Sequence, residues 1–287
     1  MGKVFIHVGY PRTASTFIQD KILAKSDEIC FPHDEDLYLK MCSDPGLNLD
    51  KYKNMDKPVI FSCEDFAIGR FFEIWPQDGL SNPIRNAERL HGHFPDATII
   101  MVIRPQQAWI RSWWQFNVLR CVGHYHSTLT FPQIVETQFF REKIYPYLRY
   151  SDMLKRYREL FGKDNVKVMF LRELSQSPET FAKEFCDTIG ITVPQLDFSK
   201  YNASKSYLFT MMRMYMNRAY HSVRKEKFDD AYFKFTKHYV GRLDFLVRRL
   251  PSRGLAKEQL EGVKEMFKDN NQELAELLNT DLTKYGF

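Results

Sequence analysis

The sequence predicts an α/β fold with a mostly parallel sheet, flanking helices and a helical C-terminal elaboration. Three segments carry this prediction. Residues 4–8 form a short apolar run that turns at 9–11 into a segment with helical spacing. Residues 97–103 are continuously apolar, as in a central strand buried on both faces, and residues 166–171 form a further strand before a helix expected at 178–189. Strands that alternate with helices in this way are typical of a doubly wound sheet.

Composition sets the limits within which a function can be sought. The 287 residues, 44% of them hydrophobic, suffice for one α/β domain with a sizeable core, and we expect a single domain over 1–287. A net charge of +5 suits an anionic cofactor or substrate and does not indicate nucleic acid. The five cysteines show no CxxC spacing and predict free thiols. With no recognisable signal peptide or spanning run, we expect a cytoplasmic protein without stable membrane insertion.

The first candidate site is the turn that follows residues 4–8. A strand, tight loop and helix start direct backbone N–H groups and a helix dipole at one spot, which suits a phosphate or sulfate. The spacing is P-loop-like, but the chemistry differs from Gly-x4-Gly-Lys-Ser/Thr. Ala14 replaces the second glycine, Ser15 replaces the lysine, and the cation is Arg12. This argues against an ordinary ATPase or kinase, while a strand–loop–helix unit without ligand is the alternative.

A second candidate follows the strand predicted at 59–61. Glu64 comes at the carboxyl end of this strand, where parallel sheets bind ligands. A carboxylate at this edge can accept a proton from a bound substrate, so Glu64 is the candidate general base. The alternative is that Glu64 or Asp65 caps the helix that follows.

A third candidate is the pair Arg104 and Ser112. Arg104 ends the strand at 97–103, and Ser112 lies about two turns into the helix expected to end at Arg120. A guanidinium fork and a hydroxyl donor can bind one phosphate together. Each residue alone is common at a helix start or on a helix face.

Taken together, these stretches resemble the PAPS-dependent sulfotransferases, in particular the bacterial and carbohydrate types. Residues 10–16, YPRTAST, are similar to the 5′-phosphosulfate loop, usually Pro-Lys/Arg-x-Gly/Ala-Thr/Ser-Thr, with Arg where many members have Lys and Ala where many have Gly. Arg104 and Ser112 resemble the 3′-phosphate site. The resemblance implies nucleotide binding through these positions: Arg12, Thr13, Ala14, Ser15, Thr16, Phe17, Arg104 and Ser112. Lys205 matches loosely a basic loop that closes on the 3′-phosphate, and a surface turn is equally compatible.

The resemblance implies transfer of a sulfuryl group from PAPS to an acceptor hydroxyl or amine, with release of PAP and without a metal. Arg12 and the loop amides would stabilise the developing charge, and Glu64 would act as the base, with His124 as the alternative. The acceptor would be a carbohydrate or small molecule. Its identity and the oligomeric state are not predicted.

Two rival functions stay open. One is an atypical P-loop kinase, which requires magnesium-dependent ATP binding. The other is a non-enzymatic polyanion-binding module, because residues 213–253 contain eleven Lys or Arg against four Asp or Glu. A solvated helical face accounts for the same charges, and no recognised nucleic-acid module is present.

Overall fold

The computed structural model describes residues 2–68, 83–196, 205–247 and 257–287. The chain divides into two compact units. The first comprises Met1–Pro105, Arg149–Lys200 and Asp269–Phe287, and the second comprises Gln106–Leu148 and Tyr201–Lys268. That residues 1–287 form a single domain stays a prediction.

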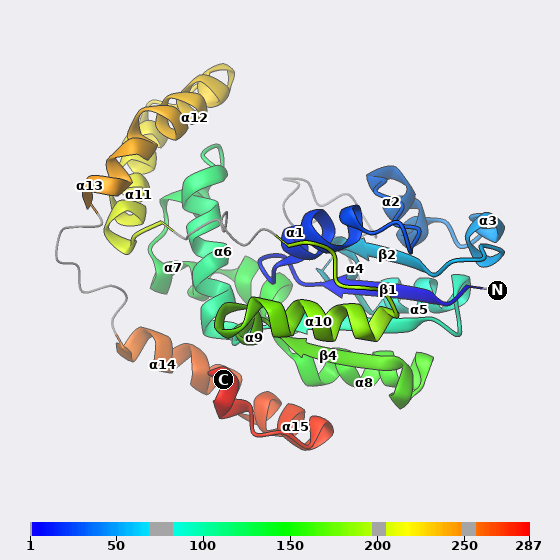
Figure 1. Ribbon diagram of the computed structural model, residues 1–287. Helices are drawn as coiled ribbons and strands as arrows, with labels where there is room; N and C mark the ends of the chain where they lie inside the picture. The colour runs from blue at the N-terminus through cyan, green and yellow to red at the C-terminus, as the bar shows by residue number, and fades with distance from the viewer. Residues whose placement is uncertain (1, 69–82, 197–204, 248–256) are drawn as a thin grey trace. The chain divides into compact units, whose positions relative to one another are not determined.

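A parallel sheet forms the centre of the first unit (Figure 1). In the described residues it has four strands in the order β2-β1-β3-β4, with every neighbouring pair parallel. The α/β prediction is therefore confirmed. Because the strand order reverses beside β1, the carboxyl ends of β1 and β3 form a topological switch point, where such sheets bind ligands. The strands are β1 (Val4–Gly9), β2 (Val59–Cys63), β3 (Thr98–Ile103) and β4 (Val166–Phe170).

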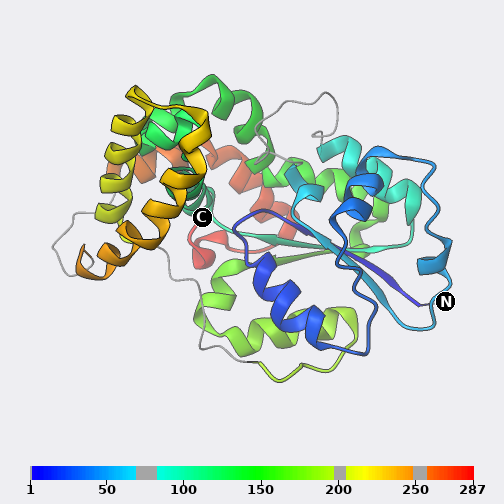
Figure 2. The same ribbon diagram turned by 90° about the horizontal axis from the view of Figure 1, so that it is seen from above.

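One face of the sheet packs on α10 and on the helical segment that follows β1 (Figure 2). Ile18 and Ile22 of that segment are buried in one cluster with Phe181 and Phe185 of α10. The segment after β1 is α-helical, then π-helical, then 3-10 helical. Helix α9 connects β4 to α10. The bounds are α1 (Ser15–Phe17), a π-helical turn (Ile18–Ile22), a 3-10 turn (Leu23–Lys25), α9 (Leu171–Gln176) and α10 (Pro178–Ile189).

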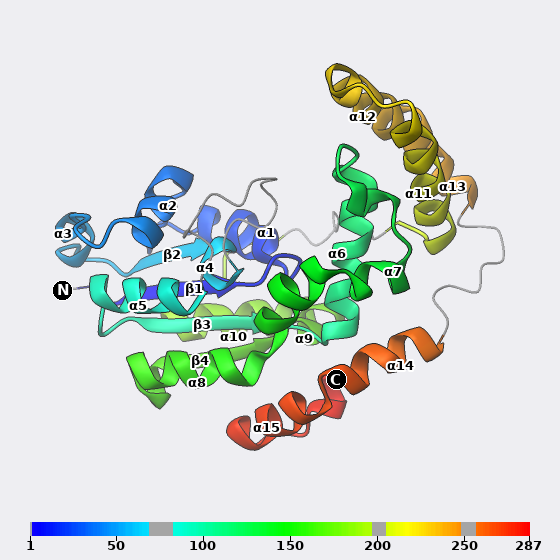
Figure 3. The same ribbon diagram turned by 180° about the vertical axis from the view of Figure 1, so that it is seen from behind.

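The opposite face is covered by α5 and α8, which lie on the near side of the sheet in Figure 3. The polar stretch at 33–57 contains two short helices, α2 and α3, joined by loops. Helix α2 buries Tyr38, Met41 and Cys42, so its few apolar residues share one face despite the polar composition. The bounds are α2 (Glu35–Ser43), α3 (Asp50–Lys53), α4 (Asp65–Ile68), α5 (Pro83–His93) and α8 (Tyr150–Phe161).

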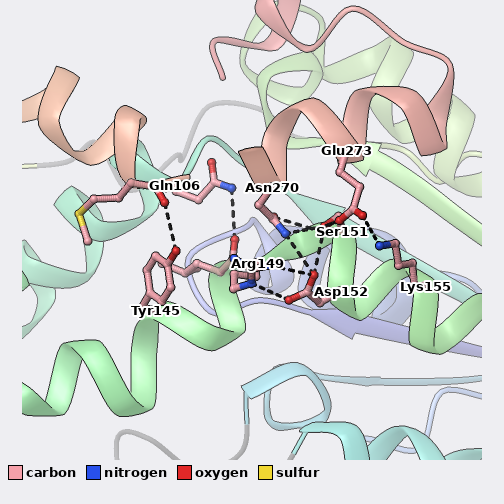
Figure 4. Close-up of polar contacts among 10 residues, drawn as sticks. Gln106, Tyr145, Arg149, Ser151, Asp152, Lys155, Asn270 and Glu273 are labelled. Atoms are coloured by element: carbon pink, nitrogen blue, oxygen red, sulfur yellow. Dashed lines mark hydrogen bonds and ion pairs between the residues drawn. The ribbon is translucent and has the colours of Figure 1, made fainter. Parts of the chain in front are cut away.

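The C-terminal helical elaboration ends in two helices, α14 (Lys257–Met266) and α15 (Lys268–Leu278). The break lies close to the boundary between the units, and α15 packs on α8 of the first unit. Figure 4 shows the polar contacts that fix α15: Asn270 donates to the Ser151 hydroxyl, and Lys155 forms an ion pair with Glu273. Ser151 and Asn270 are both buried, so these bonds satisfy polar groups inside the interface.

The second unit is helical in its described part. The tryptophans of α6, Trp109, Trp113 and Trp114, are buried and form its core together with residues of α7 and α11. No helix among the described residues has the length and hydropathy required to cross a membrane. The bounds are α6 (Gln106–Arg120), α7 (Phe131–Glu136), α11 (Tyr207–Ser222), α12 (Asp229–His238) and α13 (Asp244–Val247).

Candidate functional site

The loop after β1 contains two non-glycine residues with left-handed backbone. Arg12 has φ +69° and Ala14 has φ +67°, values that side-chain-bearing residues adopt infrequently. The N–H and hydroxyl of Thr13 both donate to the Tyr10 carbonyl oxygen, at 3.2 Å and 2.5 Å, and close the turn. Left-handed residues that alternate with other conformations turn successive N–H groups toward one side, an arrangement that binds anions.

Arg104 holds this loop from the neighbouring strand. It follows the last residue of β3, and its Nη1 donates to the Arg12 carbonyl oxygen at 2.9 Å. The predicted loop cation and the predicted 3′-phosphate residue therefore meet at the switch point between β1 and β3. A guanidinium carries five N–H donors, so bracing the loop and binding a phosphate are compatible roles.

Ser15 and Glu64 are in direct contact. The Ser15 hydroxyl donates to Glu64 Oε1, and this bond joins the first turn of the helix after β1 to the end of β2. Ser15 is buried, whereas Glu64 is partly exposed. The carboxylate predicted as the base therefore lies against a hydroxyl predicted to bind the phosphosulfate, and it retains access to solvent. Asp65, the alternative helix cap, is the first residue of α4.

A second link joins the same helix to β2 one turn further along. Gln19 Nε2 donates to the Ser62 carbonyl oxygen at 3.0 Å and to the Ser62 hydroxyl at 3.2 Å. His7 Nδ1 lies 2.8 Å from the same hydroxyl. His7 is fully buried, and burial lowers its pKa to about 4, so the imidazole is neutral near pH 7.

This second link was not predicted, and the spacing of its residues is compatible with it only once the two elements are known to be neighbours. Ser15 and Gln19 are four residues apart, which places them on one face of a helix. Ser62 and Glu64 are two residues apart, which places them on one face of a strand. Two pairs with matched periods on adjacent elements can form two cross-links, as observed here.

The loop residue Tyr10 packs against an aromatic side chain of α8, which also contacts the C-terminus. Tyr10 is buried and meets Tyr150 of α8 edge to face, with 4.9 Å between ring centroids. Phe287 contacts Tyr150 in turn, at 6.2 Å. Gly286 has φ +90°, and a Cβ there would lie 3.6 Å from Pro105 Cγ. The closing residues thus pack beside the end of β3, next to Arg104.

The side chains of the remaining predicted loop residues differ in their exposure to solvent. Thr16 is exposed, whereas the Phe17 side chain is buried in the core, so any contribution of Phe17 to anion binding comes from its backbone N–H. Thr13 is buried, and both of its donors are engaged with Tyr10 as described above. Its expected role as a ligand through the side chain stays a prediction.

Ser112, Lys205 and His124 belong to the second unit, so their roles beside the loop stay predictions. Lys205 Nζ lies 3.3 Å from Oδ2 of the buried Asp244, which gives this lysine a structural partner. Burial, followed by the charge of Arg224, lowers the pKa of His124. Across the described residues, no cluster of three or more His, Cys, Asp or Glu is arranged to hold a metal ion.

Comparison with solved structures identifies the fold. The crystal structure of a sulfotransferase from Alicyclobacillus acidocaldarius superposes with a TM-score of 0.60 and 16% identity, covering 99% of this chain and 98% of that chain. The chain has the sulfotransferase fold. The resemblance drawn from the loop and from Arg104 is thus confirmed at the level of the fold.

Two further sulfotransferase structures are similar at lower scores. Mouse sulfotransferase SULT7A1, complexed with PAP, gives a TM-score of 0.43 and 14% identity over 94% of this chain and 83% of that chain. The sulfotransferase domain from the curacin biosynthetic pathway gives 0.42 and 12% over 93% of this chain and 97% of that chain. No protein-family model matches the sequence, and no curated protein sequence matches it significantly.

Proposed function

We propose that this chain is a PAPS-dependent sulfotransferase. It would move a sulfuryl group from PAPS to a hydroxyl or amine of a carbohydrate or small molecule and release PAP. The observation that carries the proposal is the meeting of Arg12, Ser15, Glu64 and Arg104 at the carboxyl ends of β1, β2 and β3. The sulfotransferase fold supports it, because the same sheet edge carries the motifs that resemble the cofactor loops.

The donor set fits the 5′-phosphosulfate of PAPS. A guanidinium at Arg12, the hydroxyl of Thr16 and the N–H groups of a helix start are groups that bind an oxyanion without a metal. Because the Ser15 hydroxyl donates to Glu64, Ser15 would contribute its backbone N–H. PAPS supplies the activated sulfuryl group when it is bound. Arg104 would select the 3′-phosphate, and Ser112 and Lys205 are the proposed contributions of the second unit.

Glu64 carries the proton transfer in this proposal. As the acceptor oxygen or nitrogen bonds to sulfur, its proton passes to the Glu64 carboxylate. The bond between sulfur and the bridging oxygen breaks, and the electron pair stays on PAP. Arg12 and the loop amides stabilise the charge that develops on that oxygen. The Ser15 hydroxyl and the Gln19–Ser62 link hold Glu64 in position while it accepts the proton.

Calorimetric titration with PAP, with ADP as the control and EDTA present, tests the proposal. Charge-assisted bonds to the 3′-phosphate should make PAP bind at least about tenfold more tightly than ADP. Arg12→Ala should weaken both ligands, and Arg141→Ala, an exposed arginine in the second unit, should change neither. Equal affinity for PAP and ADP would overturn the assignment. ATP binding in a separate titration with magnesium and without EDTA would favour the kinase alternative.

Arg104→Ala separates two roles of this residue. If Arg104 reads the 3′-phosphate, the variant loses the preference for PAP over ADP. If it only braces the loop through the Arg12 carbonyl, the variant weakens both ligands by the same factor and keeps the preference. The second outcome would remove Arg104 from the 3′-phosphate site and leave the loop assignment intact.

We further propose a cytoplasmic location. All five cysteines are free thiols, which supports a reducing compartment. Labelling of the thiols in intact cells, compared with labelling after lysis, tests this proposal. Disulfide-bonded cysteines in the native protein would contradict it.

A further inference from the structure

An exposed apolar stripe runs from α12 into α13 in the second unit. Its four residues are Phe235, Tyr239, Leu243 and Leu246, which are 50%, 67%, 42% and 58% exposed. They recur every three or four residues, which places them on one side of the helical path. The Phe235 and Tyr239 rings also contact each other, at 5.7 Å between centroids. The stripe is therefore continuous, unlike singly scattered surface hydrophobics.

The side of the path next to the stripe packs into the second unit. Thr236, Val240 and Asp244 are buried. On that side Tyr232 stacks on Tyr220 of α11, with 4.0 Å between ring centroids, and α11 and α12 run side by side (Figure 1). The fold thus uses one face of this segment for its own packing and leaves the apolar stripe outward.

The charges beside the stripe are mostly positive, and the sole exposed carboxylate of α12 and α13 is Asp230, at the start of α12. Within 231–247, all of which the structure describes, Lys234, Lys237 and Arg242 are exposed. The sole carboxylate in this range, Asp244, is 4% exposed and pairs with Lys205. The outward face therefore combines aromatic and leucine side chains with cations, and its one exposed carboxylate, Asp230, lies at the end of the path away from Leu243 and Leu246.

We infer that this face docks on an anionic lipid bilayer, with the helical path lying in the plane of the headgroups. Basic side chains around a stripe of aromatic and leucine residues are the signature of an interfacial helix. A polysaccharide would use the cations, but Leu243 and Leu246 would gain nothing from it. A second copy of the same face would bring like charges together. This inference is independent of the proposed catalytic function.

Flotation of the full chain with lipid vesicles tests the inference. Vesicles of phosphatidylcholine with phosphatidylserine should bind the chain about tenfold or more tightly than phosphatidylcholine alone, with an effect that declines as salt rises. Leu243→Ser with Leu246→Ser should lower binding by about tenfold or more, because it removes the apolar contact. Since both leucines are exposed, this double variant should fold, which its circular dichroism melting curve checks.

A charge-matched pair of triple variants isolates the face from net charge. Lys234→Gln, Lys237→Gln and Arg242→Gln together should lower binding to phosphatidylserine vesicles on the order of a hundredfold. The control replaces three exposed cations elsewhere, Arg141, Lys143 and Lys163, by Gln and should bind like the unmodified chain. Equal losses in the two triple variants, or no vesicle binding by the unmodified chain, would overturn the inference. The inference would also be overturned if the unmodified chain binds heparin or self-associates, the variants lose that property, and no form of the chain binds vesicles.

Discussion

Replacement of Ala14 by glycine perturbs the left-handed loop on which the candidate site depends. Ala14 has φ +67°, a conformation that costs a residue with a Cβ about 1–2 kcal/mol. Glycine removes this cost but loses about 0.5–1 kcal/mol through its greater freedom in the unfolded chain. We therefore expect Ala14→Gly to stabilise the protein by about 0.5–1 kcal/mol. For 287 residues the unfolding entropy is about 0.6 kcal/mol/K, so Tm should rise by about 1–2 °C.

Equilibrium unfolding in urea measures this difference. The matched control is Ala219→Gly, an exposed alanine inside α11, which should lose about 1 kcal/mol because glycine is unfavourable in a helix interior. The two substitutions are chemically identical, but the positions differ in backbone conformation and in burial, because Ala14 packs against the core and Ala219 is exposed. If Ala14→Gly destabilises the protein as much as Ala219→Gly does, Ala14 is not left-handed in solution, and the account of the loop is wrong.

Three further predictions concern the network around the loop and the C-terminal helix. His7 is neutral when folded and titrates near 4, whereas the unfolded chain titrates near 6.5. Stability should therefore fall as pH drops through this window, by about 2 kcal/mol between pH 7 and 5, and His7→Gln should remove that part of the slope in urea titrations at the two pH values. Asn270→Ala should cost about 1–3 kcal/mol in urea unfolding by leaving buried partners unsatisfied, while the exposed Gln272→Ala should cost little; similar losses would contradict the role of the buried contact. Glu64→Gln should abolish turnover yet leave PAP bound at least as tightly, because it removes a negative charge near an anionic ligand, and weaker calorimetric PAP binding would refute this.

The strands and the loop were predictable because their signals are local. The continuous apolar run at 97–103 contains β3, and the turn at 9–11 marks the end of β1 as expected. For Glu64, the sequence predicted only that it lies at the same sheet edge as the loop. The bond between Ser15 and Glu64 joins residues 49 positions apart and depends on which strands are neighbours. That pairing is set by tertiary packing, which local spacing does not encode.

Other features could not be predicted because long-range packing overrides the local pattern. Residues 18–22 have ordinary helical spacing, yet they wind as a π-helical turn that contains Gln19. No Gly or Pro stands between α14 and α15, yet the two helices belong to different units and separate at Phe267. In both cases the segment follows the surface against which it packs.

The surroundings of Glu64 favour a functional role over a structural one. A carboxylate next to an anion-binding loop opposes the binding of that anion, because like charges repel. Glutamine would accept the same hydrogen bond from Ser15 without this cost. Yet several hydrogen bonds stabilise the surroundings of Glu64. Arg104 at the end of β3 donates to the loop, and Gln19 joins the helix to β2 beside Glu64. A charge that weakens ligand binding, held firmly in place and partly open to solvent, is what a proton acceptor at this position requires.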